Sequence, residues 1–191
     1  MLYQVAEKLA TDLKANLPFA DKVAGLVKVG SKDDRRFPIA YNMNPVAGDN
    51  DHYTDLVPDS SKTSILYFMD QGTTEEDPHN HYTDYRAVLK LVVWVNYTKI
   101  NEMITTPIYN DSYLVAEVRN KITEYFRGYR CIAFCHTTVL GQDQKDGGVF
   151  SAFTTYNEQE EQYYTYPYDY FSLNLDIYFR AVKDCTDFTT L

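Results

Sequence analysis

The stretch YFSLNLDIYFRAV, residues 170–182, decides the fold of this 191-residue chain. Hydrophobic residues occupy every second position, and most of the positions between them are polar. Because successive side chains of a strand point to opposite faces, this alternation predicts a strand with one buried and one polar face. Such one-sided burial is typical of antiparallel sheets. The positions predicted to face the core are Phe171, Leu173, Leu175, Ile177, Phe179 and Ala181.

Two amphipathic helices are predicted beside this sheet. Residues 2–17 have apolar side chains at spacings of three and four, which predicts a helix that Pro18 ends. A second helix is predicted over residues 111–127, with Asp111 or Ser112 as its N-cap. The other face of each helix is polar, so both are expected to lie on the sheet. The apolar stripes are Leu2, Val5, Leu9, Leu13 and Leu17 in the first helix and Leu114, Val115, Val118, Ile122 and Phe126 in the second.

Shorter apolar stretches predict the remaining strands and the loops between them. The order of elements predicts an α+β fold in a single domain over residues 1–191: a mainly antiparallel β-sheet with two helices packed on one face. The predicted strands cover residues 26–30, 37–43, 64–70, 87–97, 131–140 and 149–156, before the one at 170–182. The predicted long loops cover residues 44–63, 71–84 and 157–169.

Composition excludes several classes of function. The formal net charge is −9 and the isoelectric point is near 4.8, so the chain lacks the general attraction of a basic protein to nucleic acids and anionic membranes. No apolar run approaches the ~20 residues that span a bilayer, and the first residues do not form a signal peptide. Three cysteines, an odd number, fit a reducing compartment. We therefore expect a protein made in a cytoplasm, with no membrane partner.

The tripeptide His79-Asn80-His81 raises the possibility of a metal site. The nuclease motif of the same letters is excluded, because here the tripeptide lies between two predicted strands with no helix after it. Two histidines on an extended segment supply only half of the ligands that a transition metal needs. His52, and the carboxylates of Glu76, Asp77 and Asp84, are the residues that would complete the set. A metal-dependent hydrolase that uses His52, His79 and His81 stays an alternative, but we expect no bound metal.

Motifs for other chemistry are absent from the sequence. There is no G-x-S-x-G nucleophile elbow, no P-loop and no G-x-G-x-x-G dinucleotide fingerprint. The stretch CIAFCH, residues 131–136, has one residue too many between its cysteines for haem c attachment. Cys131 and Cys135 are expected to pack in the core as small hydrophobic residues. The sequence therefore predicts a protein that is not an enzyme and holds no cofactor.

Tyrosine is unusually frequent, with 18 residues against a single tryptophan. Its apolar ring and polar hydroxyl suit strands, half-buried surfaces and protein interfaces. One interpretation is contact between subunits, with Tyr163, Tyr164, Tyr166 and Tyr168 as interface candidates. The alternative is a small-molecule or carbohydrate-binding module, in which these four tyrosines and Tyr170 stack on sugar rings.

The layout of elements resembles the tail-terminator and tail-completion (neck) proteins of tailed bacteriophages. The similar segments are MLYQVAEKLATDLKANL (1–17), SILYFMD (64–70), YRAVLKLVVWVNYTKI (85–100), NDSYLVAEVRNKITEYFRG (110–128) and DYFSLNLDIYFRAV (169–182). They cover most of the chain as a pattern of elements, while the loops at 44–63 and 157–169 are longer than those of a minimal member. The Tyr- and Asn-rich composition also resembles structural proteins of crAss-like phages.

This resemblance implies a virion structural protein of the neck or tail, synthesised in the cytoplasm of a bacterial host. Its implied partners are copies of itself in a hexameric or dodecameric ring, neighbouring neck or tail proteins, and DNA that passes through a central channel without specific binding. A lining of carboxylates would repel phosphates and let DNA slide. The candidate lining residues are Glu75, Glu76, Asp77, Glu158, Glu160 and Glu161.

Overall fold

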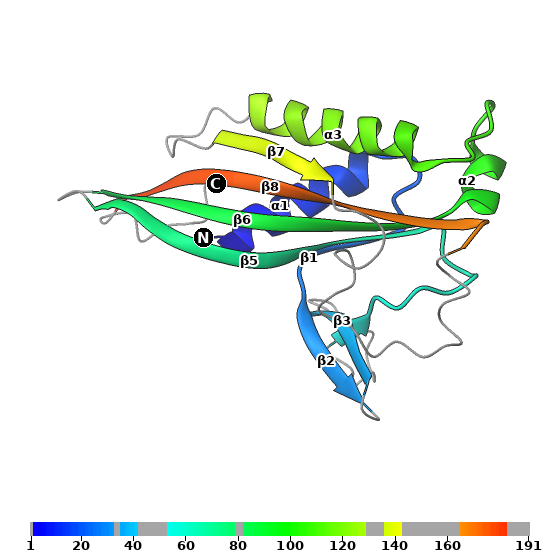
Figure 1. Cartoon of the computed structure of the whole chain (residues 1–191), viewed down its shortest axis with the longest axis horizontal. Coiled ribbons are helices and arrows are strands. Elements are labelled where there is room, and N and C mark those ends of the chain that lie inside the picture. Colours follow the sequence, from blue (N-terminus) through cyan, green and yellow to red (C-terminus); the bar gives the residue numbers. More distant parts are fainter. Residues whose placement is uncertain are drawn as a thin grey trace.

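The computed structural model describes residues 2–32, 35–41, 53–78, 82–128, 136–142 and 165–182 (Figure 1). In this part of the chain the helices are α1 (Leu2–Asn16), α2 (Tyr97–Met103) and α3 (Asp111–Gly128). The strands are β1 (Lys22–Leu26), β2 (Lys28–Lys32), β3 (Arg35–Tyr41), β4 (Tyr53–Asp55), β5 (Ser64–Pro78), β6 (Tyr82–Asn96), β7 (His136–Gln142) and β8 (Tyr168–Val182). The predicted α+β class is confirmed.

The larger sheet has its strands in the order β1-β5-β6-β8-β7. Its centre is an antiparallel ladder between β6 and β8, which runs from Tyr82 opposite Val182 to Asn96 opposite Tyr168 without a register shift. β5 pairs antiparallel with β6 on one side of this ladder, and β7 pairs antiparallel with β8 on the other. β1 pairs parallel with the first residues of β5 and is the exception to an antiparallel sheet.

The main hydrophobic core lies between this sheet and the helices α1 and α3, which cover one face of it (Figure 1). Every apolar position predicted for the two helices is buried in this core or packed against it. In β8, the predicted inward residues Phe171, Leu173, Leu175 and Ile177 are all completely buried. Burial of each such side chain contributes roughly 1.5–3 kcal/mol to folding. The side chains of Phe179 and Ala181 lie outside the described residues.

A second, smaller core lies on the opposite face of the sheet. Trp94 of β6 is buried there, and its ring stacks on Tyr168 of β8 at a centroid distance of 5.4 Å. The other buried members are Ala24, Leu56, Ile65, Tyr67 and Val92. A three-stranded antiparallel sheet, in the order β2-β3-β4, projects from this side of the molecule (Figure 1).

The loop predicted for residues 71–84 is wrong over its described part. β5 continues to Pro78 and β6 starts at Tyr82, so the two strands form one long hairpin. Each strand has 15 residues and spans roughly 45–50 Å. The hydrophobic alternation stops after residue 70, but backbone pairing with β6 needs no hydrophobic side chains. Since β8 supports β6 along its whole length, the polar half of β5 is held as a strand.

Helix α2 stands where the sequence predicted the end of a strand. The side-chain oxygen of Asn96 accepts hydrogen bonds from the backbone nitrogens of Thr98 at 3.1 Å and Lys99 at 3.5 Å, and this cap starts the helix. The prediction of two helices is therefore correct for α1 and α3 but misses α2. A similar correction applies to α3, where Asn110 accepts from the backbone nitrogen of Ser112 at 3.1 Å and takes the capping role predicted for the next two residues.

Strand β1 was also missed by the sequence pattern, because its middle residues Ala24 and Gly25 do not alternate in character. A Cβ on Gly25 would lie 2.1 Å from a carboxylate oxygen of Glu7, so α1 lies directly over this strand. Burial there raises the pKa of the Glu7 carboxyl above its usual value, although a hydrogen bond with Tyr3 partly opposes the change.

The remaining boundaries differ in detail from the prediction. The strands predicted at 26–30 and 37–43 correspond to the hairpin of β2 and β3. The predicted loop 44–63 contains the short strand β4, and the loop predicted to end at 169 ends before β8 begins at Tyr168. The strand predicted at 131–140 is described from His136 onward as β7. The predicted strand 149–156 and the two cysteines of CIAFCH lie outside the described residues.

Tyr97 joins β6, α2 and the start of β8, and its removal tests this junction. Its backbone nitrogen donates to the carbonyl oxygen of Pro167 at 2.8 Å, and its hydroxyl donates to the carboxylate of Asp169 at 2.9 Å. We expect Tyr97→Phe to lower the free energy of unfolding by about 1.5 kcal/mol, because a hydrogen bond to a charged group is lost. Urea denaturation measures this loss. Tyr109→Phe is the matched control: Tyr109 is 66% exposed and should change stability by less than about 0.5 kcal/mol, so equal losses in the two variants would contradict the expectation.

Candidate functional site

The first candidate surface is the hairpin of β2 and β3, residues 28–32 and 35–41, which we call the arm. It stands away from the large sheet (Figure 1). Gly30 pairs with Phe37 across the hairpin, and a Cβ on Gly30 would lie 2.9 Å from Ile39 and 3.0 Å from the Phe37 ring. These two apolar side chains therefore close over the glycine. Lys28, Val29, Ser31 and Arg36 are exposed, and Val29 keeps 45% of its surface accessible.

The base of the arm is fastened to the body of the protein. Leu56, which follows β4, donates its backbone nitrogen to the carbonyl oxygen of Pro38 in β3 at 3.0 Å. The Leu56 side chain is buried in the smaller core, and Ala40 and Val27 pack against the same core. The arm is therefore a fixed projection of the fold.

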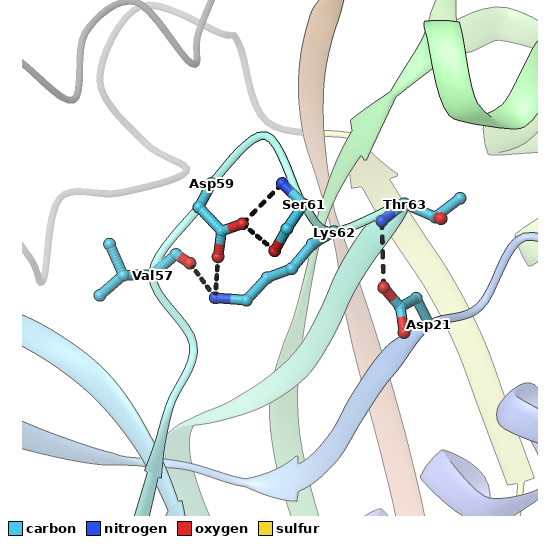
Figure 2. A network of polar contacts seen from close by, with 6 residues as sticks. All are labelled: Asp21, Val57, Asp59, Ser61, Lys62 and Thr63. Carbon is cyan, nitrogen blue, oxygen red and sulfur yellow. Dashed lines mark hydrogen bonds and ion pairs between the residues drawn. The ribbon is translucent and has the colours of Figure 1, made fainter.

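Figure 2 shows the turn that leads from Leu56 back to β5. The carboxylate of Asp59 accepts hydrogen bonds from the backbone nitrogen of Ser61 at 2.7 Å and from its hydroxyl. The Lys62 ammonium lies 2.7 Å from the other Asp59 oxygen and donates to the carbonyl oxygen of Val57 at 2.5 Å. The two charged groups of this short turn therefore interact with each other and with groups of the same turn.

The same turn is tied to the beginning of β1. The backbone nitrogen of Thr63 donates to the Asp21 carboxylate at 3.0 Å (Figure 2). Ser64 is fully buried, and its hydroxyl donates to the carbonyl oxygen of Phe19 at 2.7 Å while accepting from the Asp21 backbone nitrogen at 3.0 Å. These bonds join the connection after α1 to the start of β5.

The second candidate surface is the outer side of β5 over residues 70–75, which we call the β5 edge. β1 accompanies β5 only as far as Phe68, and all six residues of the β5 edge are exposed. The register shifts between Asp70 and Thr73, where Gly72 has a φ of 128° and donates its backbone nitrogen to the Asp70 carboxylate at 2.7 Å. Glycine suits this backbone conformation, and the bulge protects the edge from indiscriminate strand pairing.

The arm and the β5 edge differ in charge. Residues 28–36 contain four basic and two acidic residues, a net charge of +2. Residues 70–75 contain two acidic residues, Asp70 and Glu75, and no basic residue, a net charge of −2. The arm is therefore a locally basic part of a chain whose net charge is −9.

A rigid polar pair lies on the sheet face opposite the helices. Arg86 of β6 donates two hydrogen bonds to the carboxylate of Asp176 on β8, each at 2.8 Å. The guanidinium carbon also lies 5.5 Å from the centre of the Tyr178 ring. Asp176 is buried, whereas the Arg86 side chain is 41% exposed. This bidentate contact fixes the relative positions of the two central strands, β6 and β8.

A third surface carries exposed aromatic residues at the end of the molecule where α2 lies, and we call it the aromatic end. It comprises Met103, Tyr109, Tyr113 and Tyr166, all of which are more than half exposed. The segments that hold them meet there because Tyr97 binds Pro167 and Asp169, and because Asn101 hydrogen bonds both backbone groups of Ile108. Burial and the neighbouring Asp169 raise the pKa of the Tyr97 phenol far above its usual value.

The predicted site residues fall partly on these surfaces. Glu75 is exposed on the β5 edge, and Glu76 and Asp77 continue the same strand with side chains outside the described residues. Tyr166 is 69% exposed at the aromatic end. Tyr168 is instead half-buried and stacks on Trp94, and Tyr170 packs against the smaller core. The other predicted site residues lie outside the described residues: His52, His79, His81, Glu158, Glu160, Glu161, Tyr163 and Tyr164.

Sequence reasoning missed the arm as a surface, and it placed Glu75, Glu76 and Asp77 in a loop where the structure has the strand β5. The signal for the arm was the short basic strands flanking Asp33 and Asp34, but nothing in the sequence shows that this hairpin leaves the sheet. Within the described residues, no group of three or more His, Cys, Asp or Glu side chains is arranged to hold a metal ion. Nor is any helix in the described ranges long and apolar enough to cross a membrane.

No family model matches the chain, and no curated protein or solved structure matches it either. Its function has to be inferred from the surfaces that the fold presents.

Substitutions of Arg86 and of Asp176 are expected to lower the free energy of unfolding by unequal amounts. Arg86→Met leaves the buried Asp176 carboxylate without its guanidinium partner and should lower the free energy of unfolding by about 2–4 kcal/mol. Asp176→Asn leaves a half-exposed guanidinium that water can solvate, so it should cost about 1–2 kcal/mol. Urea denaturation of both variants measures the difference. A larger loss for Asp176→Asn would contradict the unequal burial of the two groups.

The Asp59 turn is expected to make stability depend on pH. Burial raises the pKa of the Asp59 carboxyl, but hydrogen bonds from Lys62 and Ser61 outweigh it and hold this pKa below its usual 3.8. A pKa lowered by folding stabilises the protein above the usual value, and this contribution is lost as the pH falls through the folded value. Asp59→Asn should therefore cost no more than about 1 kcal/mol at neutral pH, because the side chain is 40% exposed. Denaturation at a series of pH values should show the difference shrinking below pH 3.8; a constant difference would contradict it.

Proposed function

We propose that this chain is a structural protein of a tailed-bacteriophage virion, which assembles with copies of itself into a ring in the neck or tail. The ring would act as a tail terminator or tail-completion protein, joining tail parts, or head to tail, around a DNA channel. The proposal assigns the protein no catalytic role, metal or cofactor. Synthesis in the bacterial cytoplasm would precede incorporation into the virion.

The observation that carries the proposal is the presence of two unlike exposed surfaces on one firmly built fold. The arm is anchored through Leu56 and the Asp59 turn, and the β5 edge belongs to a hairpin supported by β8. Two different surfaces that bind each other produce head-to-tail contacts between copies, and such contacts close into a ring when the rotation per subunit allows it. A molecule with a single self-complementary patch would instead form a dimer.

The aromatic end supports contact with other virion proteins above or below the ring. Tyrosine and methionine are enriched in the buried parts of protein interfaces, and lysine and glutamate are depleted there. Tyr109, Tyr113 and Tyr166 are exposed to solvent at the aromatic end. An end surface of this composition suits stacking of one ring on another.

The acidity of the chain is compatible with a channel for DNA. At a net charge of −9, the surface repels phosphate groups on average, so DNA would pass without being held. Carboxylates that remain accessible after assembly would line the channel. The candidates are Glu75, Glu76, Asp77, Glu158, Glu160 and Glu161, apart from any that a neighbouring copy covers.

Native mass spectrometry and electron microscopy of the purified chain test this function. We expect closed rings of six or twelve copies, as in the phage proteins that the element order resembles. Because the surfaces are charged, the rings should dissociate more readily at high salt. A protein that is strictly monomeric in solution and in assembled particles would contradict the proposal. A monomer that binds a glycan saturably would favour the carbohydrate-binding alternative.

A further inference from the structure

We propose that the arm of one copy docks on the β5 edge of the next copy. This inference rests on the proposed function, because it names the two surfaces that meet in the oligomer. The occupant of the β5 edge is therefore a second copy of the same chain. The contact is heterologous, so it gives the assembly a direction.

The arm has the features of a pre-formed docking element. Lys28, Val29 and Ser31 of β2, an outer strand of the smaller sheet, are all exposed, with Val29 and Ser31 on one face of the strand and Lys28 on the other. The base of the arm is fixed by the bond between Leu56 and Pro38 and by burial in the smaller core. Because the arm is already ordered, docking costs little conformational entropy. Val29 adds apolar area beside the basic residues.

The β5 edge offers the complementary surface. Its side chains from Asp70 to Glu75 are all exposed, and Glu75 begins an acidic run in the sequence that continues to residue 77. The bulge at Gly72 hinders the addition of an arbitrary strand, so recognition must come from side chains as well as backbone. In the docked pair, a net charge of +2 on residues 28–36 would face −2 on the β5 edge, which steers encounter and favours one register.

The two surfaces lie in different regions of one copy. The arm follows β1 along the chain. β1 pairs with the first residues of β5, from Lys22 opposite Ile65 to Leu26 opposite Phe68. The β5 edge lies beyond Phe68, along the part of the hairpin that runs toward the opposite end of the sheet (Figure 1). The arm is anchored and points away from the sheet, so it cannot fold back onto the edge of its own chain. A contact between these surfaces therefore joins two copies.

Cross-linking identifies the contact directly. Zero-length carbodiimide coupling joins a lysine to a carboxylate that touches it. In an equal mixture of labelled and unlabelled full-length protein, we expect cross-links that join Lys28 of a labelled copy to Glu75 of an unlabelled copy, or the reverse. Cross-links found within a single copy, or assembled rings that form none between the arm and the β5 edge, would overturn the inference.

Charge reversal measures the contribution of the contact to assembly. Lys28→Glu and Glu75→Lys should each weaken association roughly tenfold at low salt, because an attraction becomes a repulsion. The double variant restores opposite charges and should recover association to within about threefold of the original. Analytical ultracentrifugation over a concentration series measures these changes, and circular dichroism verifies that each variant is folded.

Two exposed charges outside both surfaces serve as matched controls. Arg127→Glu and Glu124→Lys, both in α3, make the same changes of charge as the test variants. Association should remain unchanged in both, apart from the small general effect of net charge. If they weaken association as much as Lys28→Glu and Glu75→Lys, the effect is not specific to the arm and the β5 edge, and the inference fails.

The outcomes separate this inference from the proposed function. Rings that persist in Lys28→Glu and Glu75→Lys would overturn the docking contact and leave the ring itself standing. In that case, virions assembled with Glu75→Lys that no longer let DNA pass would assign Glu75 to the channel lining. A chain that remains monomeric under all conditions would overturn the ring, and the docking contact with it.

Discussion

The continuous ladder between β6 and β8 is the interaction on which the rest of the structure depends. It pairs 15 residues on each strand without a bulge and places the inward residues of both strands on one face. That face supplies the floor of the main core under α1 and α3. The ladder also extends past the ends of the helices, and there it supports the polar half of β5. Both the buried core and the exposed hairpin therefore depend on the same pairing.

The register of this ladder is fixed by hydrophobic and polar constraints together. A slip of one residue would move Leu173 and Leu175 from the core to the opposite face. The same slip would separate Arg86 from Asp176, whose two hydrogen bonds need both side chains on the same face of the sheet. Opposite-face burial adds a third constraint, because Trp94 can stack on Tyr168 only in this register. The polar face predicted for residues 170–182 is thus partly buried, and Ser172 and Asp176 belong to the fixed interior.

The surfaces available for assembly follow from where this support ends. β1 stops beside Phe68, and over residues 70–75 β5 is exposed to solvent. The chain that follows β1 turns away into the arm, and the Asp59 turn brings it back at Thr63. One strand ending early therefore accounts for both the exposed edge and the projection. In the proposed ring, the exposed edge and the projection would make lateral contacts, and the aromatic end would make axial ones.

The sequence by itself determined the elements whose side chains carry a repeating pattern. The stripes of α1 and α3, and the alternation in β6 and β8, were readable because burial on one face imposes a fixed period on hydrophobic residues. From these patterns followed the α+β class and most of the core. The acidity and the abundance of tyrosine can likewise be read from the sequence, and both favour a role in assembly.

Tertiary structure alone decided the features that backbone contacts create. The second half of β5 is a strand because β6 lies beside it, β1 is a strand because β5 accepts it, and α2 begins because Asn96 caps it at the end of the ladder. None of these needs a periodic pattern of side chains. For the same reason, the sequence offered Glu75 and Tyr168 as equivalent surface candidates. Packing on Trp94 buried part of Tyr168 in the fold and left Glu75 on an exposed edge.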